Sequence, residues 1–194
     1  MIYTFPRSGP NRLAPPVPGG VLCGAYPVAW RGNPPEPVDH RAIDFCAPKG
    51  TPIIAILPGV VVTKTTTEHG GNNFIISHGS FVTYYAHCDR IFKEIGDRVQ
   101  KFEIVATVGQ TGVTSQGYTP DPHLHMQVMA TASFSSEHYD PVAFLDGLGV
   151  QKRGLNFYWK DGYPKGLSPI LALGIGALAV VGGVFVWTKV RTKV

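Results

Sequence analysis

The sequence predicts a mainly β protein in which an antiparallel sheet forms a groove, with a proline- and glycine-rich N-terminal arm and one C-terminal transmembrane helix. Three observations support this fold class. The 194-residue chain has 23 glycines, 17 prolines and only 15% charged residues, a composition that favours short strands and tight turns. Runs with strand periodicity recur between turn signals in its middle part. An uncharged stretch near the C-terminus has the length of a membrane span.

The arm is predicted over residues 1–37. Proline and glycine are concentrated in 13–20 and 33–37, which favours extended, polyproline-like chain. We expect this arm to lie against the domain and to border or partly cover its groove. The first residues lack a basic segment followed by an apolar core, so no secretory signal peptide is expected.

One compact domain is predicted over residues 38–147. Its apolar and β-branched runs are separated by Gly, Pro, Asn and Ser, as in a sheet of short antiparallel strands. The strands that we predict are Pro52–Leu57, Val60–Lys64, Phe74–Ser77, Phe81–His87, Ile104–Val108 and His123–Met129.

The C-terminal part is predicted as a juxtamembrane linker over 148–167, a transmembrane helix over 168–188 and a basic tail over 189–194. About 19 uncharged residues precede the basic tail, close to the ~20 that a bilayer core requires, and Trp187 followed by basic residues is typical of a membrane interface. Basic residues on both sides leave the orientation open. Self-association of the helix is a further expectation, because small residues share one face: Ala172, Gly176, Ala179 and Gly183.

Composition narrows the partners and the role of the cysteines. A net charge of +4 and a pI near 9.0 favour an anionic partner such as cell wall or membrane. No basic stripe interleaved with aromatic residues is present, so no nucleic-acid partner is expected. Cys23, Cys46 and Cys88 are too few for a disulfide framework, and we interpret them as small buried side chains. A bridge between Cys23 and Cys46 is the alternative.

Four of the seven histidines belong to three short motifs. Strand alternation places His123, His125 and Gln127 on one face. The same alternation gives Thr83, Tyr85 and His87 a common face on their own strand, from which His87 can reach a groove. The motifs are His40-Arg-Ala-Ile-Asp44, Tyr85-Ala-His87 and His123-Leu-His125.

The first motif suits a metal if the chain bends. A straight strand would separate His40 from Asp44 by roughly 13 Å, whereas two ligands of one zinc lie about 3 to 3.5 Å apart. Together with His123 or His125 they provide three N and O ligands and leave a position for water, as in catalytic zinc sites. Such mixed ligands suit zinc better than calcium or magnesium. A structural metal site is the alternative, and the open position argues against it.

The remaining candidates have simpler interpretations. Cys46 follows Asp44 by two residues and shares its face in a strand, but we interpret it as a packing residue rather than a ligand. His69, His78 and His138 occupy no motif position and are expected in turns or on the surface.

These motifs give the segment from about His40 to Asp146 a resemblance to the lysostaphin and LytM-type zinc endopeptidases of peptidoglycan. The family pattern is His-x-x-x-Asp, a glycine-punctuated hairpin, Tyr-x-His, Gly-x-x-Gly and His-x-His. Departures are small: Ala42 stands where the family often has glycine, and the turn at Gly79 is short. The matching segments are His40-Arg-Ala-Ile-Asp44, Gly59-Val-Val, Ile76-Ser-His-Gly79, Tyr84-Tyr-Ala-His87, Gly96-Asp-Arg-Val99, Gly109-Gln-Thr-Gly112 and Pro122-His-Leu-His125.

The resemblance implies that His40, Asp44 and His125 bind Zn²⁺ and that His87 and His123 are unligated catalytic histidines. It also implies a peptidoglycan peptide as substrate, without deciding between a pentaglycine bridge and a direct bond from D-alanine to a diamino acid. A catalytically inactive module that binds peptidoglycan or activates another hydrolase is the alternative. Such a module would typically lack one of these five residues, and the sequence has all of them.

The expected location follows from the predicted membrane segment. A hydrolase of the cell wall must reach the wall, whereas a C-terminal single-pass anchor without a signal peptide would leave the domain in the cytoplasm. We therefore expect a lytic enzyme in the virion membrane of a bacteriophage, acting in genome entry or release. The alternative is a bacterial cell envelope protein with a translocated N-terminal domain, in keeping with the basic tail remaining inside.

Overall fold

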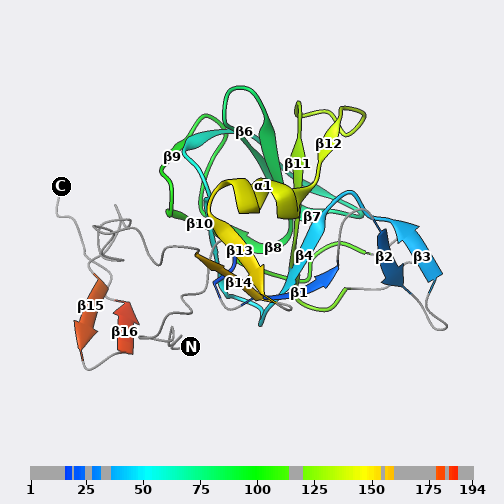
Figure 1. Ribbon diagram of the computed structural model, residues 1–194. Helices are drawn as coiled ribbons and strands as arrows, with labels where there is room; N and C mark the ends of the chain where they lie inside the picture. Colours follow the sequence, from blue (N-terminus) through cyan, green and yellow to red (C-terminus); the bar gives the residue numbers. More distant parts are fainter. Residues whose placement is uncertain are drawn as a thin grey trace.

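The computed structural model describes residues 16–18, 20–24, 28–31, 36–113, 120–153, 156–159, 178–181 and 184–187. Within them, a ten-stranded antiparallel sheet forms the body of the protein (Figure 1). Its strands are β1 (Val21–Gly24), β4 (Ile43–Cys46), β5 (Pro52–Ile54), β6 (Gly59–Thr67), β7 (Gly71–Ser77), β8 (Val82–Ile91), β9 (Arg98–Val99), β10 (Ile104–Val108), β11 (His123–Met129) and β12 (His138–Tyr139). The mainly β prediction is therefore confirmed.

The order of the strands brings the motif residues together. The sheet runs β1, β4, β11, β8, β7, β6, β9, while β10 pairs with β5 and β8, and β12 pairs with β11. In this register His125 on β11 lies opposite Asp44 on β4 and Ala86 on β8. Three segments that are distant in sequence thus contribute to one patch of the sheet.

The two faces of the sheet bury different clusters. On β8, Tyr85 is fully buried in the larger core and stacks on Phe74, with 4.8 Å between ring centroids. The neighbouring Tyr84 and Ala86 belong to a smaller cluster on the other face, with Met129 among its members. Alternate residues along β8 therefore point either into the main core or toward the opposite face of the sheet. That opposite face also bears the motif histidines of β11.

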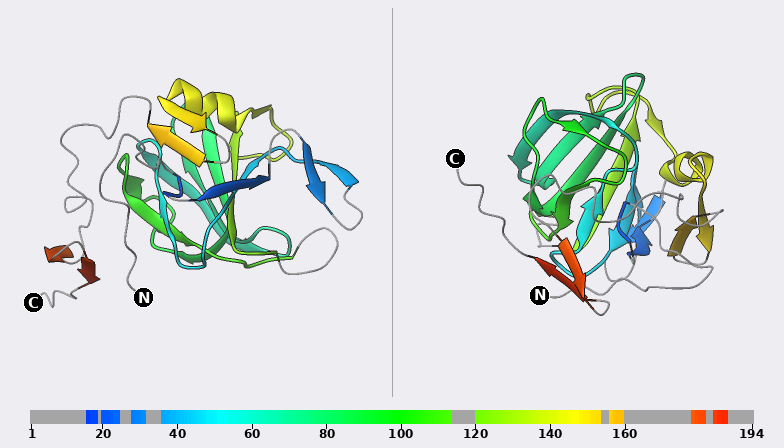
Figure 2. Two further views of the ribbon diagram at one scale, coloured as in Figure 1. Left: turned by 60° about the horizontal axis from the view of Figure 1, so that its bottom comes forward. Right: turned by 90° about the vertical axis from the view of Figure 1, so that its left-hand side faces the viewer.

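One helix occurs among the described residues, α1 (Pro141–Gly147), which the sequence analysis did not predict. Asp140 caps it by accepting hydrogen bonds from the backbone N–H groups of Val142 and Ala143, and Pro141 suits a first helical position. Leu145 is buried in the main core. Figure 2 shows α1 beside the end of the sheet that carries β1 and β4 rather than over β6 and β7.

The described part of the arm is not irregular chain. Strand β1 pairs antiparallel with β4, and Val17 and Leu22 are buried in the main core. A hairpin of β2 (Val28–Arg31) and β3 (Glu36–Asp39) follows and leads directly into His40. The prediction that the arm lies against the domain is confirmed for this part, whereas residues 1–15 lie outside the described residues.

The structure corrects the interpretation of two cysteines. Cys23 on β1 and Cys46 on β4 form a disulfide bond, whose Cα atoms are 5.8 Å apart. Only Cys88 is a buried unpaired thiol among the described cysteines. The spacing of the cysteines does not reveal this bond, because long-range pairing of β1 with β4 brings the two residues together.

The expected helix over 168–188 is not what the structure shows where it describes this segment. Residues Leu178–Val181 and Val184–Trp187 form an antiparallel strand pair, β15 and β16. The Val-rich sequence of these strands has strong strand propensity, which accounts for the difference. No helix in the described part of the chain is long and apolar enough to cross a membrane.

The rest of the C-terminal predictions is only partly covered. The linker over 148–167 contains a second strand pair, β13 (Val150–Arg153) with β14 (Asn156–Trp159). Of the small residues expected on one helix face, Ala179 lies in β15, and the other three lie outside the described residues, as do 168–177 and the basic tail.

Candidate metal centre

Three side chains from β4, its preceding turn and β11 converge on one point. Asp44 Oδ1 lies 3.2 Å from His40 Nε2 and 2.9 Å from His125 Nδ1. One donor atom of each residue lies within 4.8 Å of the other two. His40 can approach Asp44 because residues 40–42 are not part of the strand, as the distance argument from the sequence required. This bend is a confirmed prediction.

Asp44 is the centre of this cluster. Its side chain is only 1% exposed, between β1 on one side and β11 on the other. Burial by itself raises the pKa of this carboxyl, but hydrogen bonds from His125 and His40 outweigh it and hold the pKa well below its usual range. The carboxylate is therefore ionised and ready to accept a cation.

Strand β1 closes the other side of the carboxylate. Gly24 pairs with Asp44, and a Cβ added to Gly24 would lie 2.2 Å from Asp44 Oδ2. Only glycine leaves room for the carboxylate at this position. The prediction that the arm borders the site is confirmed for this strand, and the disulfide lies next to it because Cys23 precedes Gly24.

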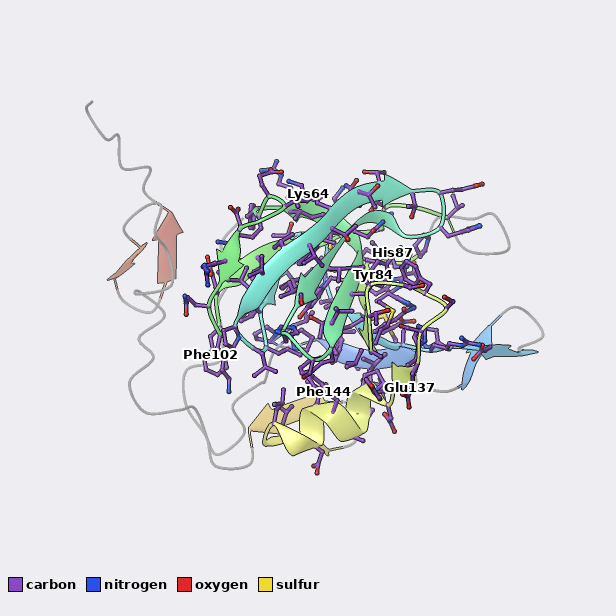
Figure 3. All side chains as sticks on the ribbon, turned by 90° about the horizontal axis from the view of Figure 1, so that it is seen from above. Lys64, Tyr84, His87, Phe102, Glu137 and Phe144 are labelled. Carbon is purple, nitrogen blue, oxygen red and sulfur yellow. A yellow bond between two sulfur atoms is a disulfide. The ribbon has the colours of Figure 1, made fainter. Side chains whose placement is uncertain are left out.

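His87 reaches the site by an unusual route. Its φ is +61°, in the left-handed region, which a non-glycine residue seldom occupies. The backbone turn moves the ring away from the face of Tyr85, so the predicted common face of Thr83, Tyr85 and His87 is wrong for His87. Its ring centroid lies 4.5 Å from that of His123 and 5.7 Å from that of His125. Figure 3 shows His87 close to Tyr84, which packs against His125.

The contacts of His87 define its chemical state. Its Nδ1 lies 2.9 Å from the carbonyl oxygen of Thr111, which accepts only, so Nδ1 carries the proton and Nε2 is the acceptor nitrogen in the neutral ring. Burial, followed by the neighbouring His123 and His125, lowers the pKa of His87 to about 4. The ring is neutral near pH 7, with a basic nitrogen on Nε2.

The loop that supplies Thr111 depends on a close backbone approach. Gly71 has φ +56°, and a Cβ there would lie 2.3 Å from Thr111. The hydroxyl of Thr111 also donates to the carbonyl of Cys88, and the N–H of His87 donates to the carbonyl of Gly70 at 2.9 Å. His87 is thus held from both sides by segments distant in sequence.

His123 has the same arrangement on the neighbouring strand. Its Nδ1 lies 2.7 Å from the carbonyl oxygen of Asp121, so Nε2 is again the acceptor in the neutral ring. That Nε2 lies 4.0 Å from Asp44 Oδ1, outside hydrogen-bond distance. His123 therefore lies beside the three converging groups without joining them.

The converging groups fit zinc. Two imidazole nitrogens and one carboxylate oxygen are a ligand set of catalytic zinc sites, which retain a further position for water or substrate. The negative, buried carboxylate supplies the charge that a divalent cation requires. Cys46 is excluded as a ligand because its sulfur is bonded to Cys23, in agreement with the interpretation from the sequence.

The structure brings all five predicted site residues together: His40, Asp44, His87, His123 and His125. Of the three histidines expected in turns or on the surface, His69 is exposed, whereas His78 and His138 are half-buried. His78 contacts the carbonyl oxygen of Pro58 and the hydroxyl of Thr83, and burial lowers its pKa. Sequence reasoning missed Gln127 as a neighbour of His125, although the shared face of the two was predicted.

The aromatic neighbours of the site were also missed. Tyr84 packs edge-on against His125, with centroids 6.3 Å apart, and against Phe134, with centroids 4.9 Å apart. Phe134 is 53% exposed. Its side chain comes from the loop after β11, and no local pattern indicated that this loop folds back toward Tyr84.

Comparison with known proteins now identifies the class to which this fold and site belong. Residues 38–141 match the model of Peptidase family M23, and the chain is a member of this family. Glycyl-glycine endopeptidase ALE-1 of Staphylococcus capitis is 30% identical over 143 residues, which are 72% of this chain and 37% of that protein. Peptidoglycan DD-endopeptidase ShyC of Vibrio cholerae is 35% identical over 91 residues, 46% of this chain and 20% of that protein.

A solved structure agrees with this assignment. The antimicrobial peptidase lysostaphin from Staphylococcus simulans superimposes with a TM-score of 0.59 at 27% identity, covering 73% of this chain and 55% of that chain. The chain spans between a fifth and about two fifths of the length of the two curated relatives. The likeness is therefore to a part of longer proteins.

Proposed function

We propose that this protein is a zinc endopeptidase that hydrolyses peptide cross-links of bacterial peptidoglycan. The observation that carries the proposal is the convergence of His40, Asp44 and His125 beside two histidines whose Nε2 atoms are acceptors. Membership of Peptidase family M23 and the names of the relatives, a glycyl-glycine endopeptidase and a peptidoglycan DD-endopeptidase, give the substrate class.

The five residues have distinct roles in this proposal. Zinc held by His40, Asp44 and His125 supplies Lewis acidity, which polarises a carbonyl and lowers the pKa of water. His123 and His87 accept a proton at Nε2 from the attacking water or orient it, and a protonated ring then donates to the oxyanion or to the leaving amine. The carbonyls of Thr111 and Asp121 keep both rings in the required orientation.

An inactive module of the same fold is the second candidate. It would need to retain the peptide-binding surface while lacking a ligand or a proton-transfer group. All five groups are present and within reach of one another, so the arrangement favours an enzyme. The two candidates differ in whether wall fragments are released.

The test uses the full chain and purified cell walls of two kinds, one with pentaglycine bridges and one with direct cross-links from D-alanine to a diamino acid. Fragments are identified by mass spectrometry, and zinc is measured in parallel. We expect Asp44→Ala to lose zinc and hydrolysis. His87→Ala and His123→Ala should keep zinc and lose hydrolysis by about 10²-fold or more, the usual worth of such groups. His69→Ala, an exposed histidine, is the control.

The outcomes separate the candidates. A zinc-loaded chain that sediments with both kinds of wall but releases no fragments would establish the inactive module. Hydrolysis at the wild-type rate by the His87→Ala or His123→Ala protein would remove that histidine from the mechanism. Cleavage of only one kind of wall would identify the cross-link.

The location of this enzyme is a separate proposal, which rests on composition. The uncharged stretch 169–187, Trp187 and the basic residues that follow it favour association with a membrane. We propose the membrane of a bacteriophage virion, with the bacterial cell envelope as the alternative. Flotation of the chain with lipid vesicles and a search for it in purified virus particles would test this. Absence from both would overturn it without affecting the enzymatic proposal.

A further inference from the structure

A chain of polar side chains leads away from the candidate metal centre on the side opposite Asp44. His125 directs Nδ1 to Asp44, and its other nitrogen, Nε2, lies 3.0 Å from the amide Nε2 of Gln127. The amide oxygen of Gln127 lies 3.3 Å from Nε2 of His138. Nδ1 of His138 lies 2.9 Å from the carbonyl oxygen of Ser136. Four groups therefore connect the metal centre to the loop before β12.

The backbone keeps this series of polar side chains in place. Gln127 follows His125 by two residues on β11, so both side chains leave the same face of the strand. His138 belongs to β12, which pairs with β11 through Met129. All three side chains are partly buried, which limits competition from water. Tyr84 lies opposite Gln127 on β8 and packs against the ring of His125.

The positions of the protons follow from the end of the chain. The carbonyl of Ser136 can only accept, so Nδ1 of His138 carries a proton, and Nε2 is the acceptor in the neutral ring. A donor must then face that Nε2, and the only donor that Gln127 offers is its amide NH₂. A half-turn of the amide exchanges its oxygen and nitrogen at the same two positions. The NH₂ group then faces His138, and the amide oxygen faces His125.

The same reasoning fixes the proton on His125. The amide oxygen of Gln127 needs a donor, so Nε2 of His125 carries a proton, and Nδ1 is the nitrogen that can give its lone pair to a metal. The opposite amide orientation would place the proton on Nδ1, where it would block a metal. The hydrogen bond between Nδ1 and Asp44 Oδ1, 2.9 Å long in the metal-free protein, is replaced when a cation binds, because Nδ1 then gives its lone pair to the cation.

We propose that Gln127 and His138 are positioning residues that hold His125 in the tautomer whose Nδ1 binds zinc. The proposal rests on the proposed zinc site and adds two residues to it. Hydrogen bonds to the non-ligating nitrogen of a metal-binding histidine orient the ring and raise its basicity, and losing one typically weakens metal affinity about 10- to 100-fold.

Zinc affinity, measured by competition with a chromophoric chelator, tests this independently of hydrolysis. Gln127→Leu removes the acceptor and should weaken zinc binding about 10- to 100-fold. Gln127→Glu keeps an acceptor for Nε2–H of His125 and should restore affinity to within a few-fold of wild type. His138→Ala leaves the amide of Gln127 free to adopt either orientation, so the zinc affinity of this variant should lie between those of Gln127→Leu and Gln127→Glu.

Gln100→Leu is the matched control, because Gln100 is exposed and lies near β9, on the edge of the sheet opposite β1. Thermal unfolding of the metal-free proteins verifies that each variant folds. If Gln127→Leu does not fold, the Glu and His138→Ala variants still decide. Wild-type zinc affinity in the Gln127→Leu protein would overturn the proposal. So would wild-type zinc affinity in His138→Ala combined with a Gln127→Glu protein that binds zinc as weakly as Gln127→Leu. Either result in a chain that still cleaves walls would leave the enzymatic proposal intact.

Discussion

The disulfide between Cys23 and Cys46 predicts a large effect of reduction on stability. The two residues are 23 positions apart, and closing a loop of that length is worth about 3 kcal/mol in the chain-entropy model. For a chain of this size, about 3 kcal/mol corresponds to a fall in Tm of roughly 10 °C. Cys23 is exposed and Cys46 is half-buried, so a phosphine reductant can reach the bond.

Reduction should also weaken the metal centre. Without the bond, β1 is held by its pairing with β4 and by the burial of Leu22 and Val17. Opening of β1 exposes the carboxylate of Asp44, which Gly24 covers, and water then competes for it. We expect the reduced protein to bind zinc less tightly than the oxidised protein.

The assay is thermal unfolding with and without the reductant, in metal-free and zinc-loaded protein. The double variant Cys23→Ser and Cys46→Ser should unfold at the Tm of the reduced wild type, and the reductant should not change its Tm. Cys88→Ala keeps the bond and should respond to the reductant as wild type does. A wild-type Tm that moves by less than about 2 °C on complete reduction would refute the loop-closure reasoning.

The site itself can be tested in three further ways. Gly24→Ala places a Cβ 2.2 Å from Asp44 Oδ2 and should reduce the zinc retained after dialysis, whereas Gly147→Ala, with nothing within 4 Å, should not. The lowered pKa of Asp44 adds folding stability that is fully present above its unfolded pKa, near 3.8, and is lost as the pH falls through the folded value. In acid unfolding of the metal-free proteins, the free energy of unfolding of Asp44→Asn should therefore lack this pH-dependent loss. Because the pKa of His87 in the free protein is lowered to about 4, its acid limb in the pH profile of kcat/KM should lie near pH 4, and a limb at 6.5 that disappears in His87→Ala would contradict this.

Strand periodicity and motif spacing predicted the parts of the fold that local sequence decides. Strands β10 and β11 begin and end at the predicted residues, because β10 is a mostly apolar run and β11 alternates polar and apolar residues. The bend between His40 and Asp44 was also predictable, since two ligands of one ion cannot remain at opposite ends of a straight strand.

His87 shows where local reasoning ends. Alternation along β8 assigns it to the buried face of Tyr85, but its φ of +61° turns it to the other face. The cause is non-local, because the carbonyls of Gly70 and Thr111 accept from its backbone N–H and its Nδ1. A backbone conformation that is costly for this residue type persists only because both partners come from other segments. Nothing in residues 83–87 alone indicates it.

The strand β1 raises the same difficulty from the other side of the site. Its composition, rich in proline and glycine on both flanks, predicts an extended arm, and pairing with β4 can be inferred only once the position of Asp44 is known. The presence of glycine at position 24 is then explained, since any side chain there would occupy the space of the Asp44 carboxylate. Asp44 is thus enclosed by β1, bonded to His40 and His125, and supported through His125 by Gln127. The arm and the amide act on the same pair of ligands from opposite sides, so a loss of either should appear first as weaker metal binding and only afterwards as slower hydrolysis.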